Sequence, residues 1–495
     1  MNRRMPSPRA ARAALLALAG AALLAACGRA PPATTPATTP AAPGEVPVVL
    51  YLIDTLRADR LGLYGYGKPT SPQLDALARE SVVFDAAYAA APWTLPSVGS
   101  LMTSTYSCEH GLLRHSQRLS PKLATLAERL QARGYATGGY FQNAIIGPLS
   151  GLDRGLQVAE LHNDSTASLA PEAGAFLERA QGQPFFLYLH TMEPHAIEQV
   201  PPAFLKTLGH VSVDDREAYT AHWDRLTDAL HIERNQGAAA SEAAREDAAL
   251  AMQRLTGLGD SVTRLYDAAV LQADANLGTV IDLLQERGIW DKVIFIVLAD
   301  HGEAFGEHGT WFHEHTVYEE LVRVPLLIRF PGGEHGGRRV AERVSLLDVM
   351  PTLLDYLGAP GDCTGCRGRS LLPLARGTAA GWQPADVPAL RINRTVWYEP
   401  WQALRGDVNI AVRDGAWKGI WNEEPGRTEL YDLAADPGET RDLVESNAAR
   451  ARELGERAER WLAACRAALV APIEVPESEI DEATRQRLRA LGYLR

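Results

Sequence analysis

Short apolar runs that are rich in β-branched and aromatic residues recur along the chain and predict buried strands. The clearest runs are residues 47–53 (PVVLYLI), 184–189 (PFFLYL), 292–298 (KVIFIVL) and 324–330 (VPLLIRF). Runs of this length without polar alternation are typical of strands that are buried on both faces of a parallel sheet.

Helical periodicity separates these runs, at residues 71–79, 121–133, 171–179 and 266–287. Strands that alternate with helices predict an α/β fold, here a central, mostly parallel sheet sandwiched by helices. In such sheets, binding sites form at the carboxyl ends of the strands. Polar residues that directly follow a predicted strand are therefore the first candidates for a functional site.

The pattern changes in two places and so divides the chain into parts. Residues 197–262 are polar, charged and Ala-rich, which predicts a helical insertion within a larger domain at residues 47–385. Beyond that domain the apolar runs are sparser and indicate short antiparallel strands and a helix near residues 448–469. We therefore expect a smaller C-terminal α+β subdomain at residues 386–495.

The first residues carry a processing signal. Four arginines within residues 3–12 precede an apolar run, residues 13–26, that is too short to span a bilayer. The run ends in Leu-Ala-Ala-Cys at residues 24–27, which resembles the bacterial lipobox. The resemblance implies a lipoprotein signal at residues 1–27 and lipidation of Cys27. The alternative is an ordinary secretory signal with an incidental cysteine.

Residues 28–46 are rich in Pro, Ala and Thr, a composition that predicts a semi-rigid tether rather than a packed element. Together, the tether and the lipobox-like segment predict a lipid-anchored lipoprotein of the bacterial cell envelope that faces the periplasm or the exterior. Its contact with the membrane would be the N-terminal lipid.

Composition limits the partners. The chain has 495 residues, of which 46% are hydrophobic, and its formal net charge is −12. An acidic chain without a basic stripe is not built to bind nucleic acid through phosphate contacts.

Besides Cys27, the chain has four cysteines, namely Cys108, Cys363, Cys366 and Cys465. Cys363 and Cys366 form a CxxC that lacks the second Cys or His pair of a zinc site, which favours a local or structural disulfide. The sequence alone leaves the pairing of the four cysteines open.

Four polar segments carry candidate chemistry. They are residues 54–59 (DTLRAD), 92–101 (PWTLPSVGSL), 190–195 (HTMEPH) and 300–309 (DHGEAFGEHG), the last of which runs on to His313. Three of them follow a predicted strand, and the other places a hydroxyl at the start of a probable helix. Two carboxylates, an imidazole and a hydroxyl oxygen form a plausible ligand set for a divalent ion. Such an ion lowers the pKa of a bound hydroxyl and makes it a nucleophile.

These segments together resemble the sulfatase family of the alkaline phosphatase superfamily, and the resemblance runs from Val48 to about Asp442. Residues 62–66 (GLYGY), 344–353 (VSLLDVMPTL) and 429–433 (ELYDL) also resemble signatures of that family. The resemblance implies an alkaline-phosphatase-like fold and an enzyme that hydrolyses ester bonds.

The resemblance also implies a role for each site residue. Asp54, Asp300 and His301 would bind one divalent metal ion, which could be Ca, Mn or Zn, and Thr94 would be both the nucleophile and a further ligand. The catalytic partners of Thr94 would be His195 and His313, which would contact the ester oxygens or protonate the leaving group. Further candidates for substrate binding are His115, Asn143 and His190.

The chain departs from the family pattern at several positions. Thr94 stands where sulfatases carry the Cys or Ser that becomes formylglycine, and Val98 stands where an Arg is expected. The Lys expected near His313 is absent, as is the Lys-x-His expected after residues 134–135. In having Thr at the nucleophile position, the chain instead resembles the phosphodiesterase and the phosphoethanolamine- or glycerophosphate-transferring members of the superfamily.

Three functions are therefore compared. The first is a metal-dependent hydrolase of sulfuric or phosphoric esters, whose substrate is a small-molecule, glycan or lipid ester. The second is an envelope phosphoryl-group transferase, and the third is a non-catalytic surface lipoprotein with a sulfatase fold. Asp54 and Thr94 also have a structural alternative, because either could serve as a helix N-cap. We favour the hydrolase, because most such transferases carry several transmembrane helices, whereas no transmembrane helix is expected in this chain after its signal.

Overall fold

The computed structural model describes residues 45–162, 164–208, 212–236, 242–378, 382, 389–392, 408–424, 426–476, 479–480, 482 and 485–486. These residues belong to one compact unit, Ala42–Arg495. The predicted signal at residues 1–27, almost all of the predicted tether and the expected domain boundary at residue 385 lie outside the described residues. In the part of the chain that the structure describes, no helix is both long and apolar enough to cross a membrane.

Nine strands of the described chain form one sheet. At its centre lie β1 (Val48–Ile53), β6 (Phe185–Thr191) and β7 (Ile294–Leu298), which are fully buried. The remaining strands are β2 (Val82–Tyr88), β4 (Ala136–Phe141), β5 (Val158–Leu161), β10 (Arg323–Val324), β11 (Leu326–Arg329) and β12 (Arg339–Ser345). The order along the sheet is β10-β2-β11-β7-β1-β6-β4-β5, with β12 paired to β2.

The central strands are parallel, as the apolar runs predict. β1 pairs in parallel with β6 on one side and with β7 on the other, and β4 pairs in parallel with β5 and β6. The last predicted run, residues 324–330, instead contributes β10 and β11, both of which are antiparallel to their neighbours. The α/β fold with a mostly parallel sheet is thus confirmed.

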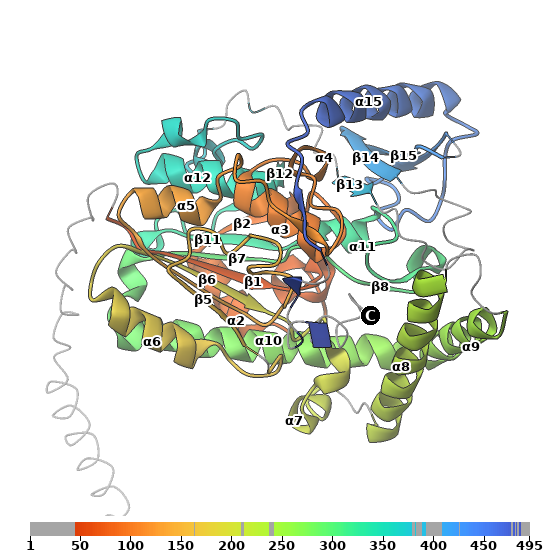
Figure 1. Ribbon diagram of the computed structural model, residues 1–495, viewed down its shortest axis with the longest axis horizontal. Coiled ribbons are helices and arrows are strands. Elements are labelled where there is room, and N and C mark those ends of the chain that lie inside the picture. Colours follow the sequence, from red (N-terminus) through yellow and green to blue (C-terminus); the bar gives the residue numbers. More distant parts are fainter. Residues whose placement is uncertain are drawn as a thin grey trace, which may run out of the picture. The chain divides into compact units, whose positions relative to one another are not determined.

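Helices cover both faces of this sheet (Figure 1). On one face lie α2 (Pro72–Leu77), α6 (Ala170–Ala180) and α10 (Asp260–Glu286), and α10 packs against the other two. The other face carries α3 (Thr94–Thr103), α5 (Leu126–Ala132) and α12 (Val349–Tyr356), and α3 packs against both of its neighbours. This sandwich places the start of α3 near the carboxyl ends of β1 and β7.

The described residues of the segment predicted as an insertion, residues 197–262, are largely helical. The segment contains η4 (Ile197–Gln199), α7 (Pro202–Leu205), α8 (Val213–Gln236) and α9 (Glu242–Leu258). Its last residues already belong to α10, which begins at Asp260. The aromatic rings of Tyr219 and Trp223 in α8 stack on each other. The ring of Trp223 also contacts that of Phe312, with the two centroids 4.4 Å apart.

A second, smaller sheet follows in the sequence. Its antiparallel strands are β13 (Ala389–Ile392), β14 (Val408–Asp414), β15 (Trp417–Asn422) and β16 (Arg427–Asp432). Helix α15 (Ala448–Ala467) packs against β14, β15 and β16 and forms a separate small core with them (Figure 1). The small C-terminal sheet and its helix agree with the expected α+β character.

Two disulfides settle the cysteine pairing that the sequence left open. Cys363 and Cys366 are joined within a single turn. Cys108 and Cys465, which are 357 residues apart in sequence, link the helix α4 (Ser107–His110) to α15. The local disulfide expected at the CxxC is therefore present, and the second disulfide joins the two parts of the chain.

Candidate active site and metal centre

The carboxyl ends of three adjacent strands bring the candidate residues together. β1 ends before Asp54, β6 carries His190 near its end, and β7 leads into Asp300. The parallel register aligns Ile53 of β1 with Thr191 of β6. Because parallel strands present their carboxyl ends at one edge, side chains from three distant segments meet there.

Three ligand atoms converge at this edge. Asp54 Oδ1, Asp300 Oδ2 and His301 Nε2 are fully buried, and a group of ligand atoms from these residues lies within 4.8 Å of one another. His301 Nε2 is 3.6 Å from Asp54 Oδ1 and 3.5 Å from Asp300 Oδ2. Among the described residues, neither of these two carboxylate oxygens has a hydrogen-bond partner. Buried oxygens without partners are costly unless a cation binds them, so the residues fit a divalent metal ion.

The other polar atoms of the same side chains are already bound, which aims the free atoms at one point. His301 Nδ1 donates to the carbonyl of Gly302 at 2.8 Å, so the lone pair of Nε2 faces the carboxylates. Asp300 Oδ1 accepts hydrogen bonds from the backbone N–H groups of Thr55 and His301. Such bonds fix the orientation of these candidate ligand side chains.

Asp54 is held in the same way. Its Oδ2 accepts a hydrogen bond from Asn143 Nδ2 at 2.9 Å and lies 3.0 Å from His190 Nε2. His190 Nδ1 in turn lies 2.8 Å from the hydroxyl of Tyr188. Both ring nitrogens of His190 are thus engaged within the protein, and the residue acts on Asp54.

Thr94 begins helix α3 and points its hydroxyl at the same cluster. Thr94 Oγ1 lies 3.2 Å from His301 Nε2 and 3.5 Å from Asp54 Oδ2, and the residue is fully buried. The N-cap of α3 is Trp93, so the alternative reading of Thr94 as an N-cap is not realised. The same holds for Asp54, because the next helical turn, η1 (Ala58–Arg60), has Arg57 at its N-cap.

The protonation of the buried groups also favours a cation. Burial and the nearby charge of Asp54 raise the pKa of Asp300 well above its ordinary value. Burial would raise the pKa of Asp54 as well, but the hydrogen bond from His190 and the neighbouring histidines lower it below the usual range. Burial lowers the pKa of His301 to about 3, so its imidazole is neutral and able to coordinate a metal. A divalent ion would let both carboxylates ionise together.

Two further histidines lie beside the cluster. The ring centroid of His313 is 4.6 Å from that of His301 and 5.2 Å from that of His195. Burial lowers the pKa of His195. Burial would also lower the pKa of His313, but Glu303, whose Oε1 lies 3.1 Å from His313 Nδ1, raises it to about 9. The site therefore pairs one neutral and one cationic imidazole.

The remaining candidate, His115, lies next to helix α3. Its ring meets that of Trp93 edge-on, with centroids 5.2 Å apart. Glu303 belongs to the motif at residues 300–309, but nothing in its local pattern assigned it a role. Its partner His313 lies ten residues further along the chain and is brought to it by the pairing of β8 (Ala304–Phe305) with β9 (Trp311–Phe312).

The fold and the site together define an α/β protein with a candidate metal site at the carboxyl edge of its sheet. The sequence model of the Sulfatase family matches residues 47–359, and the chain belongs to this family. A second model, described as N-sulphoglucosamine sulphohydrolase, C-terminal, matches residues 306–464. Family membership confirms the resemblance found in the sequence and identifies the protein as a hydrolase of ester bonds.

Known relatives cover most of the chain. An N-acetylglucosamine-6-O-sulfatase of Bacteroides thetaiotaomicron is 24% identical over 465 residues, which cover 80% of this chain and 82% of the relative. A solved protein in complex with its substrate, D-glucosamine-2-N,6-O-disulfate, superposes with a TM-score of 0.66 at 22% identity and covers 86% of this chain and 98% of its own. A phosphonate monoester hydrolase of Agrobacterium radiobacter gives a TM-score of 0.61 at 20% identity, with coverage of 88% and 98%. At this identity the solved structures show the shared fold alone.

Proposed function

We propose that this protein hydrolyses phosphoric esters in preference to sulfuric esters, with Thr94 as an unmodified nucleophile. The observation that carries the proposal is the position of Thr94 Oγ1, 3.2 Å from His301 Nε2 and 3.5 Å from Asp54 Oδ2 at the start of α3. A hydroxyl that is buried beside candidate metal ligands from other elements has little structural use there. Its location agrees with the nucleophile position implied by the sulfatase resemblance.

Asp54, Asp300, His301 and Thr94 would hold one divalent ion, with Mn or Zn better suited than Ca because of the imidazole. When bound, the ion supplies charge that stabilises a deprotonated hydroxyl and the ester oxygens. In the protein itself, Asp54 Oδ2 is within reach to accept the hydroxyl proton of Thr94.

The reaction proposed for phosphoric esters has two displacement steps. Thr94 Oγ1 forms a bond to phosphorus while the bond from phosphorus to the leaving alcohol breaks, and a protonated histidine delivers a proton to the alcohol. His313 suits this role because Glu303 keeps it protonated. Water then attacks the phosphoryl-Thr94, which releases phosphate or a phosphate monoester and restores the hydroxyl.

The preference for phosphorus follows from the residue at position 94. A formylglycine hydrate can expel sulfate by collapsing to the aldehyde, whereas a sulfate ester on Thr94 has no such route. On a phosphoryl-Thr94, water can instead attack phosphorus and displace the Thr94 oxygen. Val98, which is fully buried in α3, also leaves the site without the Arg that the sulfatase pattern expects there.

A substrate panel tests the proposal. Metal-reconstituted protein is assayed with nitrophenyl sulfate, a nitrophenyl phosphate monoester and a bis(nitrophenyl) phosphodiester. We expect turnover of a phosphoric ester, a loss of ~10³-fold or more in Thr94→Ala, and partial retention in Thr94→Ser. Thr207→Ala, the same change at an exposed residue after α7, is the matched control. Efficient sulfate hydrolysis without phosphoesterase activity, or full activity of Thr94→Ala, contradicts the proposal.

A further inference from the structure

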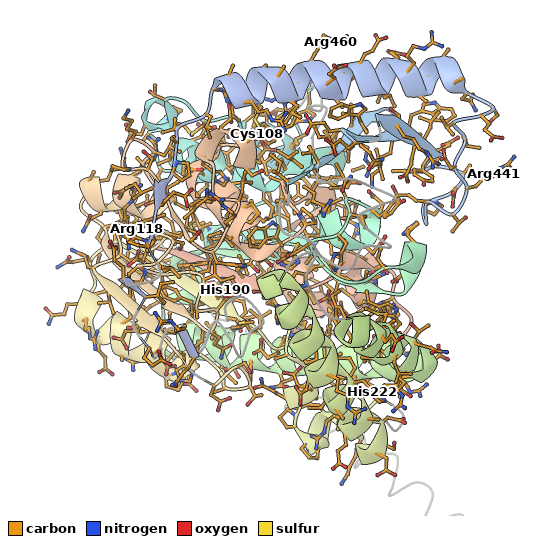
Figure 2. The ribbon with its side chains drawn as sticks, turned by 45° about the vertical axis from the view of Figure 1, so that its right-hand side comes forward. Cys108, Arg118, His190, His222, Arg441 and Arg460 are labelled. Atoms are coloured by element: carbon orange, nitrogen blue, oxygen red, sulfur yellow. A yellow bond between two sulfur atoms is a disulfide. The ribbon has the colours of Figure 1, made fainter. Side chains whose placement is uncertain are left out.

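The chain returns to the catalytic domain after α15. Cys465, near the end of that helix, is disulfide-bonded to Cys108 in the short helix α4 (Figure 2 shows Cys108 below α15). Five residues further on, the backbone N–H of Val470 donates to the carbonyl of Glu109 at 2.7 Å. Residues 465–475, called the C-terminal strap below, are thus fixed to α4 by one covalent and one hydrogen bond.

The strap then pairs with the segment that contains His115. Its last residues form β17 (Ile473–Glu474), which is antiparallel to β3 (Gln117–Arg118). The N–H of Val475 donates to the carbonyl of Ser116 at 2.7 Å. Contacts of the Glu474 carboxylate complete the pairing, since Oε1 accepts hydrogen bonds from Arg114 at 2.6 Å and Gln117 at 2.9 Å. The strap therefore contacts the residues that precede and follow His115 in the sequence.

From α4 the contacts continue to the nucleophile helix. The N–H of Leu112 donates to His110 Nδ1, so the proton of this imidazole is on Nε2. Nε2 lies 3.2 Å from the carbonyl oxygen of Pro96 and 3.2 Å from Ser100 Oγ, both in α3. Burial lowers the pKa of His110 to about 4, which keeps the ring neutral and preserves this arrangement.

α3 and α4 are also in close steric contact. A side chain at Gly99 would place its Cβ 2.8 Å from the ring of His110, so only a glycine allows the approach. The first turn of α3, which begins at Thr94, is thus held through His110. Trp93, the residue before Thr94, is held in addition by the ring of His115.

We propose that the C-terminal strap positions both the nucleophile helix and His115, so that turnover depends on the Cys108–Cys465 disulfide. The inference deepens the proposed function and rests on it for its activity readout. Residues 107–118 form only a four-residue helix and a two-residue strand, so their local order depends on what they are fixed to. A displacement of about 1 Å in a reacting group costs on the order of 10²-fold in rate.

The second disulfide offers a matched control. Cys363 and Cys366 lie three residues apart in one turn, so their bond closes that turn and does not join α4 to α15. Cys108→Ser/Cys465→Ser and Cys363→Ser/Cys366→Ser therefore remove one disulfide each. We expect the first pair of substitutions to lower kcat by ~10-fold or more, measured at a temperature well below the unfolding midpoint of that variant. The second pair should stay within about twofold of the parent. Equal kcat in both double variants overturns the inference.

Glu474→Ala tests the other end of the strap and keeps the disulfide. It removes the contacts to Arg114 and Gln117, so His115 loses support while His110 remains in place. We expect KM to rise by ~3-fold or more with kcat nearly unchanged, because each lost hydrogen bond is a modest one. Glu456→Ala, which removes an exposed ion pair to Arg460 within α15 and outside the strap, is the control and should change neither constant. A uniform loss in Glu474→Ala and Glu456→Ala contradicts positioning by the strap.

Amide hydrogen exchange provides a readout that needs no substrate. Residues 107–118 should exchange ~10-fold faster in Cys108→Ser/Cys465→Ser than in the parent, and no such change should occur in the Cys363→Ser/Cys366→Ser protein. If the parent hydrolyses no ester, the proposed function fails, while the exchange result still decides whether the strap orders this segment. Unchanged exchange overturns the inference even if Thr94 is essential. If the Cys108 variant does not fold, Glu474→Ala carries the same measurement.

Discussion

His190 Nε2 lies 3.0 Å from Asp54 Oδ2, and both side chains are fully buried at the carboxyl edge of the sheet. An ionised carboxylate only accepts hydrogen bonds, so the ring proton is on Nε2, and Nδ1 accepts from the hydroxyl of Tyr188. This chain of bonds leaves Asp54 Oδ1 as the oxygen available to a metal ion.

Removal of His190 should therefore weaken metal binding without deleting a ligand. We expect His190→Ala to lower the affinity for the metal by ~10–100-fold, the usual cost of losing a group that orients a ligand. Tyr188→Phe should have a smaller effect in the same direction. Affinity is measured by competition with a chelator, and His162→Ala, near Glu172 at a partly exposed position, is the control. Unchanged affinity in His190→Ala would show that Asp54 needs no such support.

Asp300 should be required for metal binding itself. Asp300→Asn keeps the shape of the side chain but removes the charge and one ligand oxygen. We expect elemental analysis to find little bound metal after dialysis, and activity should fall with it. Asp291→Asn, at an exposed position nine residues earlier, should bind as much metal as the parent. Full occupancy in Asp300→Asn would exclude Asp300 as a main ligand.

Glu193 should make the folded protein less stable at high pH. Burial raises the pKa of Glu193 from its ordinary value of 4.5 to about 7, and its Oε1 accepts a hydrogen bond from Asn276. Between these two values the folded state holds a proton that the unfolded state has lost, so the free energy of unfolding falls as pH rises from 4.5 to 7. The full difference is on the order of 3 kcal/mol.

Glu193→Gln keeps the oxygen for Asn276 and removes the titration. Relative to the parent, we therefore expect a clear gain in melting temperature at pH 8 and a much smaller change at pH 5. Glu178→Gln, at an exposed position of α6, should follow the parent at both pH values. A shift that is equal at pH 5 and pH 8 would mean that Glu193 does not titrate in this range.

Cys27 is predicted to carry the membrane anchor. The motif at residues 24–27 resembles a lipobox, and a lipidated cysteine would hold the protein on the membrane. Cys27→Ser should move the protein from the membrane fraction into the soluble envelope fraction, as followed by immunoblot. Cys363→Ser, which leaves the motif intact, should stay with the membranes. If Cys27→Ser fractionates like the parent, the anchor prediction is wrong.

Local sequence determined the centre of the sheet. The runs that form β1, β6 and β7 are continuous apolar segments, and such segments predict buried strands without any knowledge of their neighbours. Their directions and spacing also predicted that Asp54, Asp300 and His301 would meet, because parallel strands end at one edge. The short motif around Thr94 could also be identified from the sequence, because its resemblance to the sulfatase pattern depends on adjacent residues only.

Other parts depended on contacts between distant residues. β4 contains Gly138 and Gly139, which are poor strand formers, but side chains there would collide with Phe176 and Leu156. Sequence patterns therefore do not predict this strand, and only the packing explains its glycines.

The same limit applies to the site. Neither the pairing of Glu303 with His313 nor the disulfide between Cys108 and Cys465 follows from spacing, since each joins residues that the folded chain alone brings together. Sequence determined which groups could do chemistry, because ligand and nucleophile chemistry belongs to the residues themselves. The tertiary structure decided which oxygen of Asp54 is free, which imidazole carries a proton and what holds α3, because these depend on burial and on neighbours distant in sequence.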